Sequence, residues 1–388
     1  MHALLPLLLL PAAAAAAPSL QIKPSLPPLP PRRIPPQEAR RHPRASAAMV
    51  IKEQQPDATV AEAPAAPEPK PPLALTLWQF SRPHTMIGSA LAIPALALYA
   101  APAGGALSSP LLLSVLYAVP PALLMNVYIV GLNQLLDIEL DKVNKPRLPL
   151  AAGTLGVPAG VGVVLASLAA SLLMGWAHPW LSTAALKATL LGSALLGTAY
   201  SLPPLRLKRF PLLASLCIMG VRGALVNWGF FTHTATVIGT APQGLAFAAG
   251  VATAAPLRCL AAVAFFTLFG TVIAIVKDVP DAKGDAMFGI RSFSVRLGQA
   301  RMLRFAVSLL ILNYSAAAVA LLAATASAGS ALVALRRGGA ACVAAGLAWS
   351  VHRRAADVQP EDPSSVYSYY MHLWKCFYSS YALLPFAR

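Results

Sequence analysis

The strongest constraint on the fold is a succession of long apolar runs that begins near Leu75 and continues to the end of the chain. Short breaks containing Pro and Gly separate these runs. Most runs are long enough for a helix to cross the hydrocarbon core of a bilayer, which needs about 20 apolar residues, and none has the alternating polarity of a membrane barrel. We therefore predict an all-α integral membrane protein with nine transmembrane helices, near residues 85–101, 111–134, 155–175, 181–199, 210–232, 257–277, 302–324, 338–352 and 366–387.

Composition supports this class and excludes others. Of the 388 residues, 57% are hydrophobic and 11% charged, and the mean hydropathy is +0.63, values typical of a membrane protein. The net charge of +16 comes from basic residues that lie mostly between the apolar runs. There they act as topology signals and as contacts for anionic lipid. The sequence has no cluster of basic and aromatic residues of the kind that binds single-stranded nucleic acid. We therefore expect membrane lipid as a partner and no nucleic acid.

The first 75 residues differ from the rest. Residues 1–17 form a short apolar block, residues 18–48 carry six basic side chains against the single acid Glu38, and residues 53–72 are rich in Pro, Ala and Glu. This order is typical of a bipartite plastid address followed by a disordered linker. We predict a targeting peptide and linker over 1–75, a polytopic membrane domain over 76–388, and a multi-pass location in a plastid (chloroplast) membrane.

Acidic residues are scarce, and their distribution points to a site. The chain has only 14 Asp and Glu, and six of those in the membrane body form two clusters, Asp137/Glu139/Asp141 and Asp278/Asp281/Asp285. Acids gathered beside membrane spans are a functional-site hypothesis by default. Alternation of the predicted spans places both clusters on the side that carries most Lys and Arg, so they face one compartment.

The spacing within the clusters favours a metal site. Asn133, Asp137 and Asp141 recur every four residues and would share one helix face. Adjacent anions repel unless a cation lies between them, and Mg²⁺ prefers carboxylate and amide oxygens with substrate phosphates as further ligands. Pro280 and Gly284 predict that part of the second cluster lies on a loop. A diphosphate bridged by Mg²⁺ fits such a site, whereas the alternative is a pair of unrelated solvated helix ends.

Two further stretches carry polar groups on the same side. The segment Tyr200–Arg209 offers cations for direct contact with a diphosphate, and Tyr200 offers a hydrogen bond or a π-face to a carbocation. Arg82, which precedes the first span, is suited to bind a carboxylate with two hydrogen bonds. Each also fits a simpler interpretation, as a topology signal or as an interfacial anchor. No glycine-rich phosphate loop, GxSxG or HExxH occurs in the sequence.

These motifs resemble those of the UbiA superfamily of membrane prenyltransferases. Asn133/Asp137/Asp141 is similar to its first aspartate-rich motif, and Asp278/Asp281/Asp285 to its second. The stretches 82–85, 130–146, 277–281 with 284–285, and 288–298 are similar to plastid homogentisate prenyltransferases. Within that group, the stretches 288–294 and 374–386 are similar to the phytyltransferase branch. The stretch 200–210 is closer to the solanesyltransferase branch. The resemblance covers residues 76–388 and leaves the length of the prenyl chain open.

The resemblance implies a fold, an activity and a set of residue roles. It implies nine helices around a central cavity and Mg²⁺-dependent prenyl transfer from a polyprenyl diphosphate, with phytyl or geranylgeranyl favoured, to homogentisate with decarboxylation. Such a reaction belongs to tocopherol or plastoquinone biosynthesis. The alternatives are a solanesyltransferase, a member that uses another acceptor, a transporter with paired acids as ion ligands, and a non-catalytic membrane partner protein. The residues assigned to metal are Asn133, Asp137, Asp141, Asp281 and Asp285; those assigned to catalysis are Asp137, Asp141, Asp281, Asp285 and Tyr200; those assigned to substrate are Asn133, Lys142, Arg82, His84, Arg206, Lys208, Lys277 and Asp278.

Overall fold

The computed structural model describes residues 71–102, 107–240 and 257–388. The predicted targeting peptide and linker lie almost wholly outside these residues, so that division of the chain stays a prediction. The first described helix, α1 (Leu73–Phe80), is short and begins where the long apolar runs begin.

Long helices coincide with all nine predicted spans in the described part of the chain. Seven of them are long and apolar enough to cross a membrane. The helices α6 and α15 have 18 and 21 residues but are not among those seven, so the count of nine crossings stays a prediction. The long helices are α2 (Pro83–Ala100), α3 (Ser109–Leu136), α5 (Val157–Trp176), α6 (Ala184–Ser201), the continuous row α7 (Pro211–Ile218), η2 (Met219–Leu225) and α8 (Val226–Val237), then α10 (Leu257–Lys277), α13 (Gln299–Thr325), α14 (Ala331–Ala356) and α15 (Pro363–Leu383).

The eighth predicted span is shorter than the helix that the structure shows. Residues 338–352 were expected, but α14 runs from Ala331 to Ala356 and includes Arg336 and Arg337. The guanidinium of Arg337 donates to the carbonyl of Ala324 at 2.7 Å. This carbonyl lies in the last turn of α13, where backbone acceptors lack helical partners and cations are favoured. A basic pair therefore lies within the helix and does not mark its end.

Small residues and aromatic rings hold the bundle together. A Cβ added to Gly229 on α8 would lie 1.7 Å from the hydroxyl oxygen of Thr189 on α6, so only glycine permits this approach of the two helices. Where α10 packs against α15, the ring of Phe266 stacks on the ring of Tyr381 with ring centroids 3.8 Å apart. The hydroxyl of Tyr314 on α13 donates to the carbonyl of Cys376 on α15 at 3.2 Å. These contacts fix the walls around the site.

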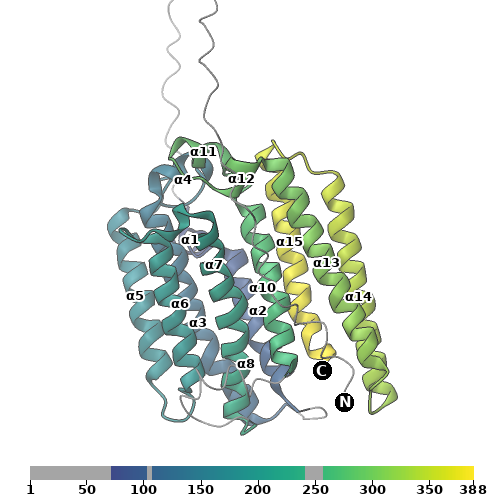
Figure 1. Cartoon of the computed structure of the whole chain (residues 1–388). Coiled ribbons are helices and arrows are strands. Elements are labelled where there is room, and N and C mark those ends of the chain that lie inside the picture. Colours follow the sequence, from purple (N-terminus) through teal and green to yellow (C-terminus); the bar gives the residue numbers. More distant parts are fainter. Residues whose placement is uncertain (1–70, 103–106, 241–256) are drawn as a thin grey trace, which may run out of the picture. The chain divides into compact units, whose positions relative to one another are not determined.

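Three short helices lie together at one end of the bundle. They are α4 (Ile138–Asn144), α11 (Ala282–Met287) and α12 (Phe293–Leu297), and Figure 1 shows them at the end opposite the C-terminus. The two acidic clusters border α4 and α11. The prediction that both clusters share one side of the membrane body is therefore confirmed.

Candidate active site

The first acidic motif does not lie on one continuous helix, and this part of the prediction was wrong. Helix α3 ends at Leu136, and α4 starts at Ile138 after Asp137, whose backbone angles of φ −122° and ψ 19° are not helical. A guanidinium nitrogen of Arg206 reaches the carbonyl of Leu136 at 3.4 Å and the carboxylate of Asp137 at 3.0 Å. Arg206 thus binds a carbonyl at the helix end and fixes Asp137 at the break.

Asp137 is the most heavily contacted acid of the site. Its side chain is buried and forms ion pairs with Arg206 and with the ammonium of Lys208. The side-chain amide of Asn133 donates to it at 2.9 Å. Burial lowers the pKa of Lys208, and the neighbouring Asp137 opposes this shift. The structure therefore brings together Asn133, Asp137, Arg206 and Lys208, as the sequence predicted.

The second motif lies on a turn and a short helix, which confirms the predicted loss of helical regularity. Helix α10 ends at Lys277, and Asp281 is the residue immediately before α11. Lys277 and Asp278 form an ion pair at 2.8 Å with both side chains partly exposed. Asp281 and Asp285 are buried.

The two motifs contact each other directly. The ammonium of Lys145, which follows α4, pairs with the carboxylate of Asp281. At the same contact, a Cβ added to Gly284 would lie 2.0 Å from the side-chain oxygen of Asn144. Gly284 therefore lets α4 and α11 approach closely. Lys145 and Asn144 are not among the predicted site residues, although both lie within the stretch 130–146 that carries the first motif.

The acids retain unsatisfied negative charge, which fits a divalent cation. Asp141 is buried, and its oxygen Oδ2 has no hydrogen-bond partner among the residues that the structure describes. Burial raises the pKa of Asp141, with Asp137 and Asp281 adding to the shift while Lys145 and Arg82 oppose it. Burial, with Asp278 and Asp281, raises the pKa of Asp285 to about 7. A hard cation between carboxylates removes this repulsion.

The described residues do not form a finished metal site. No group of three or more Asp, Glu, His or Cys side chains among them is close enough to hold an ion. The ammonium groups of Lys145 and Lys208 instead pair with Asp281 and Asp137. Metal assignments to Asn133, Asp137, Asp141, Asp281 and Asp285 therefore stay predictions. They agree with a magnesium ion that relies on substrate oxygens for part of its coordination.

One predicted contact residue lies away from the motif interface. Lys142 pairs with Glu139 at 2.7 Å, and their side chains are 51% and 71% exposed. Lys145, three residues later, occupies the position between the motifs. The role of Lys142 as a diphosphate contact stays a prediction.

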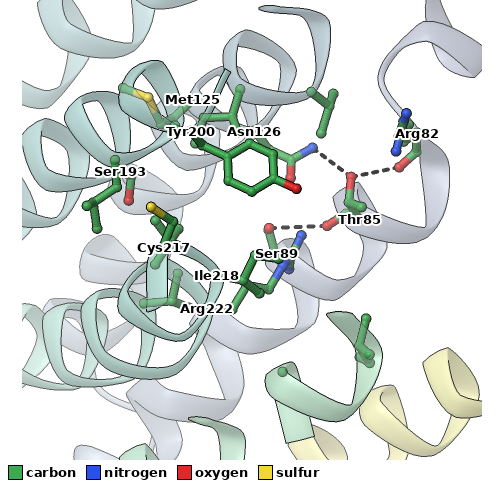
Figure 2. A pocket seen from close by; sticks show the side chains of 18 of the residues that line it. Arg82, Thr85, Ser89, Met125, Asn126, Ser193, Tyr200, Cys217, Ile218 and Arg222 are labelled. Carbon is green, nitrogen blue, oxygen red and sulfur yellow. Dashed lines mark hydrogen bonds between the residues drawn. The ribbon is translucent and has the colours of Figure 1, made fainter. Parts of the chain in front are cut away.

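A cavity of about 220 Å³ extends into the bundle from the acidic end. Asn133, Tyr200 and Lys277 line it, so it adjoins the polar ends of α3, α6 and α10. Figure 2 shows the Tyr200 hydroxyl directed into this space, on the side of Thr85 and Ser89. Tyr200 therefore lines the cavity, and its assignment to catalysis stays a prediction.

Arg82 and His84 also line this cavity. Arg82 has a left-handed backbone conformation with φ 53°, which is uncommon for a residue other than glycine. The turn is held from α3, where the amide of Asn126 donates to the Thr85 hydroxyl at 2.9 Å and the amide of Gln134 to the carbonyl of Phe80 at 2.8 Å. Figure 2 shows the Asn126 contact beside Arg82.

Sequence reasoning missed Arg222. This arginine lies in the π-helical segment η2, between α7 and α8, and lines the cavity. The signal was present, because a charged residue inside a predicted span is rare and usually functional, and π-helical turns are frequent at functional sites. The aromatic residues Tyr370 and Trp374 of α15 form the adjacent wall.

Comparison with known proteins decides the family. The UbiA prenyltransferase family model matches residues 91–376. The chain belongs to the UbiA prenyltransferase family. Membership confirms the resemblance drawn from the two aspartate motifs, and the all-helical class with it.

Individual UbiA relatives are similar over most of the chain. "Probable homogentisate phytyltransferase 1, chloroplastic" of Oryza sativa subsp. japonica is 42% identical over 313 residues, which cover 80% of this chain and 72% of that protein. "Homogentisate phytyltransferase 1, chloroplastic" of Arabidopsis thaliana is 41% identical, with 80% and 75% covered. "Homogentisate geranylgeranyltransferase" of Hordeum vulgare is 38% identical, with 81% and 72% covered.

Solved structures agree on the fold alone. The apo UbiA homolog from Aeropyrum pernix K1 is 15% identical with a TM-score of 0.52, covering 78% of this chain and 95% of that one. The UbiA homolog from Archaeoglobus fulgidus bound to GPP and Mg²⁺ is 16% identical with a TM-score of 0.51, covering 80% and 99%.

Proposed function

We propose that this UbiA member transfers a prenyl group from a polyprenyl diphosphate to homogentisate with decarboxylation, in tocopherol or prenylquinone biosynthesis. Phytyl and geranylgeranyl diphosphate are the favoured donors, because the similar proteins are named for these two groups. The solanesyl alternative has support only in the stretch 200–210 and is not favoured.

The observation that carries the proposal is the joining of the two aspartate motifs above a cavity. Lys145 pairs with Asp281 across the motifs, and Asn133 contacts Asp137 while also lining the cavity. A donor whose diphosphate lies at the acidic end and whose chain enters the bundle fits this arrangement. The paired acids border helix ends and not mid-span positions, which argues against a transporter with midplane ion ligands.

A magnesium ion fits the donor set, with Asn133, Asp137, Asp141, Asp281 and Asp285 as the residues that would hold it. When bound, it would supply Lewis-acid stabilisation of the negative charge on the leaving diphosphate. The chain contributes cations of its own: Lys208 and Arg206 lie at Asp137, and Lys277 lies at the cavity mouth. These groups bind the diphosphate and neutralise its charge as it departs.

The proposed reaction is an electrophilic aromatic substitution that balances without a further reactant. The C1–O bond of the allylic diphosphate breaks, and the bonding pair leaves with the diphosphate. A carbon of the electron-rich ring forms the new C–C bond to C1. The ring proton is released, the carboxyl carbon leaves as CO₂, and the methylene carbon that it leaves behind takes up a proton.

The cavity residues protect and orient the reacting partners. Tyr200 presents its ring and hydroxyl to the cavity beneath the motifs, where a π-face stabilises positive charge on an allylic carbon. Apolar lining residues such as Ile129, Leu196 and Ile273 exclude water that would otherwise capture the cation. No covalent enzyme intermediate is required.

The test is prenyl transfer by the purified protein in lipid nanodiscs with Mg²⁺ and labelled homogentisate. Phytyl, geranylgeranyl and solanesyl diphosphates are supplied in parallel, and prenylated product is expected with one of the first two. Asp137→Asn and Asp281→Asn should each lower its rate of formation by about 10²- to 10³-fold. Glu139→Gln is the matched control, because Glu139 belongs to the same stretch but is exposed. Absence of product with all three donors would refute homogentisate as acceptor.

We also propose a multi-pass location in a plastid membrane. The seven long apolar helices support insertion in a membrane, and two of the similar proteins are named chloroplastic. Import of the radiolabelled full chain into isolated chloroplasts, followed by membrane fractionation, tests this proposal. Failure to recover it with chloroplast membranes would contradict it.

A further inference from the structure

Arg222 is a cation placed deep in the bundle. It lies 11 residues after Pro211, the first residue of α7, which corresponds to about three helical turns from the end that carries Lys208. A charge at such a depth in a membrane protein is costly unless it faces the bundle interior and meets a partner. Its side chain lines the cavity and is only partly buried.

The described part of the protein supplies no anionic partner for Arg222. None of the ion pairs among the described residues includes Arg222. The Arg222 guanidinium also donates no hydrogen bond to those residues. Its ionisable neighbours include the phenols of Tyr370, Tyr378 and Tyr381 and the imidazole of His84. Among the described residues, those that line the cavity include Arg82, Arg222 and Lys277 but neither Asp nor Glu. The cavity therefore carries positive charge that an anionic ligand would neutralise.

The surroundings of Arg222 suit an aromatic ligand. Its guanidinium lies over the ring of Trp374, 5.2 Å from the centroid. The imidazole of His84 packs against Trp374 and Tyr370 edge-on, with centroid separations of 5.1 and 5.8 Å. Gly88 contributes no side chain beside Arg222, and a Cβ there would lie 3.6 Å from its terminal nitrogen Nη1. An aromatic wall and a cation thus lie together at the cavity.

Arg82 occupies a different part of the cavity. Arg82 follows Phe80, whose carbonyl accepts a hydrogen bond from Gln134 near the end of α3, so it lies toward the acidic motifs. No acid is among the charged neighbours of Arg222. Tyr370 lies within electrostatic reach of both arginines and of Lys277. The cavity therefore has a diphosphate end, marked by Arg82 and Lys277, and an inner end, marked by Arg222.

We infer that Arg222 binds the carboxylate of the aromatic acceptor at the inner end of the cavity, with Trp374, Tyr370 and His84 as the wall for its ring. Arg222 thereby selects acceptors that carry an acidic side chain and turns the ring toward the diphosphate end. The inference builds on the proposed use of homogentisate and assigns its carboxylate to Arg222 in place of Arg82 or His84. A guanidinium suits this role because it stays charged and matches a carboxylate with two parallel hydrogen bonds.

A purely structural role for Arg222 makes different predictions. If its stacking on Trp374 only ties η2 to α15, replacing it should lower thermal stability and kcat without affecting one substrate more than the other. Arg258 supplies the matched control. It lies 5.5 Å over the ring of Phe231 and donates to the carbonyl of Ala100 at 3.1 Å, but it does not line the cavity.

The experiment measures initial rates of the full chain in nanodiscs, with homogentisate varied at saturating prenyl diphosphate and then the reverse. Arg222→Gln is expected to raise the KM for homogentisate by about 10- to 100-fold, the range for loss of hydrogen bonds to a charged group. The KM for the donor should change by less than about twofold, within the accuracy of such values. Arg222→Lys keeps the positive charge but loses the two parallel hydrogen bonds, so its KM for homogentisate should be intermediate. This variant also provides the test if Arg222→Gln fails to fold. Arg258→Gln should leave both KM values unchanged.

A ligand that lacks the carboxylate distinguishes carboxylate binding by Arg222 from a general loss of affinity for aromatic ligands. Methylhydroquinone, used as a competitor, should have the same inhibition constant with the wild-type protein and with Arg222→Gln. Three results would overturn the inference while prenyl transfer to homogentisate stands. They are an equal loss of affinity for homogentisate and methylhydroquinone in Arg222→Gln, an unchanged KM for homogentisate, and a raised KM for the donor. If the wild-type protein does not use homogentisate, binding of a panel of labelled aromatic acids is compared with Arg222→Gln. Binding that depends on Arg222 would support the inference even though the proposed function fails. Binding that does not depend on Arg222, or no binding of any aromatic acid, would overturn the inference.

Discussion

Replacing Gly284 with Ala should separate the two aspartate motifs without disturbing the bundle. The added Cβ would lie 2.0 Å from Oδ1, 2.6 Å from Cγ and 2.8 Å from Nδ2 of Asn144. Ordinary contacts between carbon atoms lie near 3.5 Å, so roughly 1 Å or more of movement is needed at the interface of α4 and α11. A displacement of about 1 Å at reacting groups can cost about 100-fold in rate.

The assay for Gly284→Ala is kcat/KM for prenyl transfer as a function of Mg²⁺, together with the thermal midpoint. We expect kcat/KM to fall by about 10- to 100-fold and more Mg²⁺ to be needed, with little change in the midpoint. Gly162→Ala is the control, since a Cβ there meets nothing within 4 Å. The double variant Asn144→Ala with Gly284→Ala removes the obstructing atoms and should recover most of the activity. Wild-type activity in Gly284→Ala, or no recovery in the double variant, would refute this reasoning.

Other predictions concern the acids, the metal and Tyr200. Asp137→Asn should lower kcat/KM by about 10²- to 10³-fold, the usual cost of losing one group that stabilises charge; rates near wild type would contradict its role. Chelation of divalent metal should abolish turnover in a rate assay, and added Mg²⁺ should restore it. The pKa of Asp285 is raised to about 7 in the metal-free protein, so Mg²⁺ must displace a proton and its apparent affinity should fall as the pH drops from about 8 to about 6. Asp285→Asn should flatten this pH dependence in a binding titration. Tyr200→Phe keeps the π-face and should retain more of kcat than Tyr200→Leu; equal losses would argue against stabilisation by the ring.

The sequence predicted the arrangement of the acids because two physical rules combine there. Carboxylates are expensive beside membrane spans, and alternation of spans assigns each polar segment to one side. These rules located Asp137 and Asp281 at the same end, and the Lys145–Asp281 pair confirms that they meet. Pro280 and Gly284 correctly predicted the irregular second motif.

Other features depend on contacts that the spacing of residues does not encode. The break at Asp137 depends on Arg206, which is 69 residues away in the sequence. Lys142 and Lys145 look equivalent in the sequence, and only the direction of α4 places one at Glu139 and the other at Asp281. The motifs at the charged ends of the spans do not predict Arg222, although a single arginine within an apolar run is itself a signal.

The most direct test of the central claim uses homogentisate labelled in the carboxyl carbon together with prenyl diphosphate labelled in the chain. Purified protein in nanodiscs should release labelled CO₂ and form labelled lipid product in a one-to-one ratio. The rates of both should fall by about 10²- to 10³-fold in Asp137→Asn and Asp281→Asn and stay near wild type in Glu139→Gln. Lipid product that retains the carboxyl label, CO₂ release without prenylation, or full activity in the two Asp variants would contradict the account.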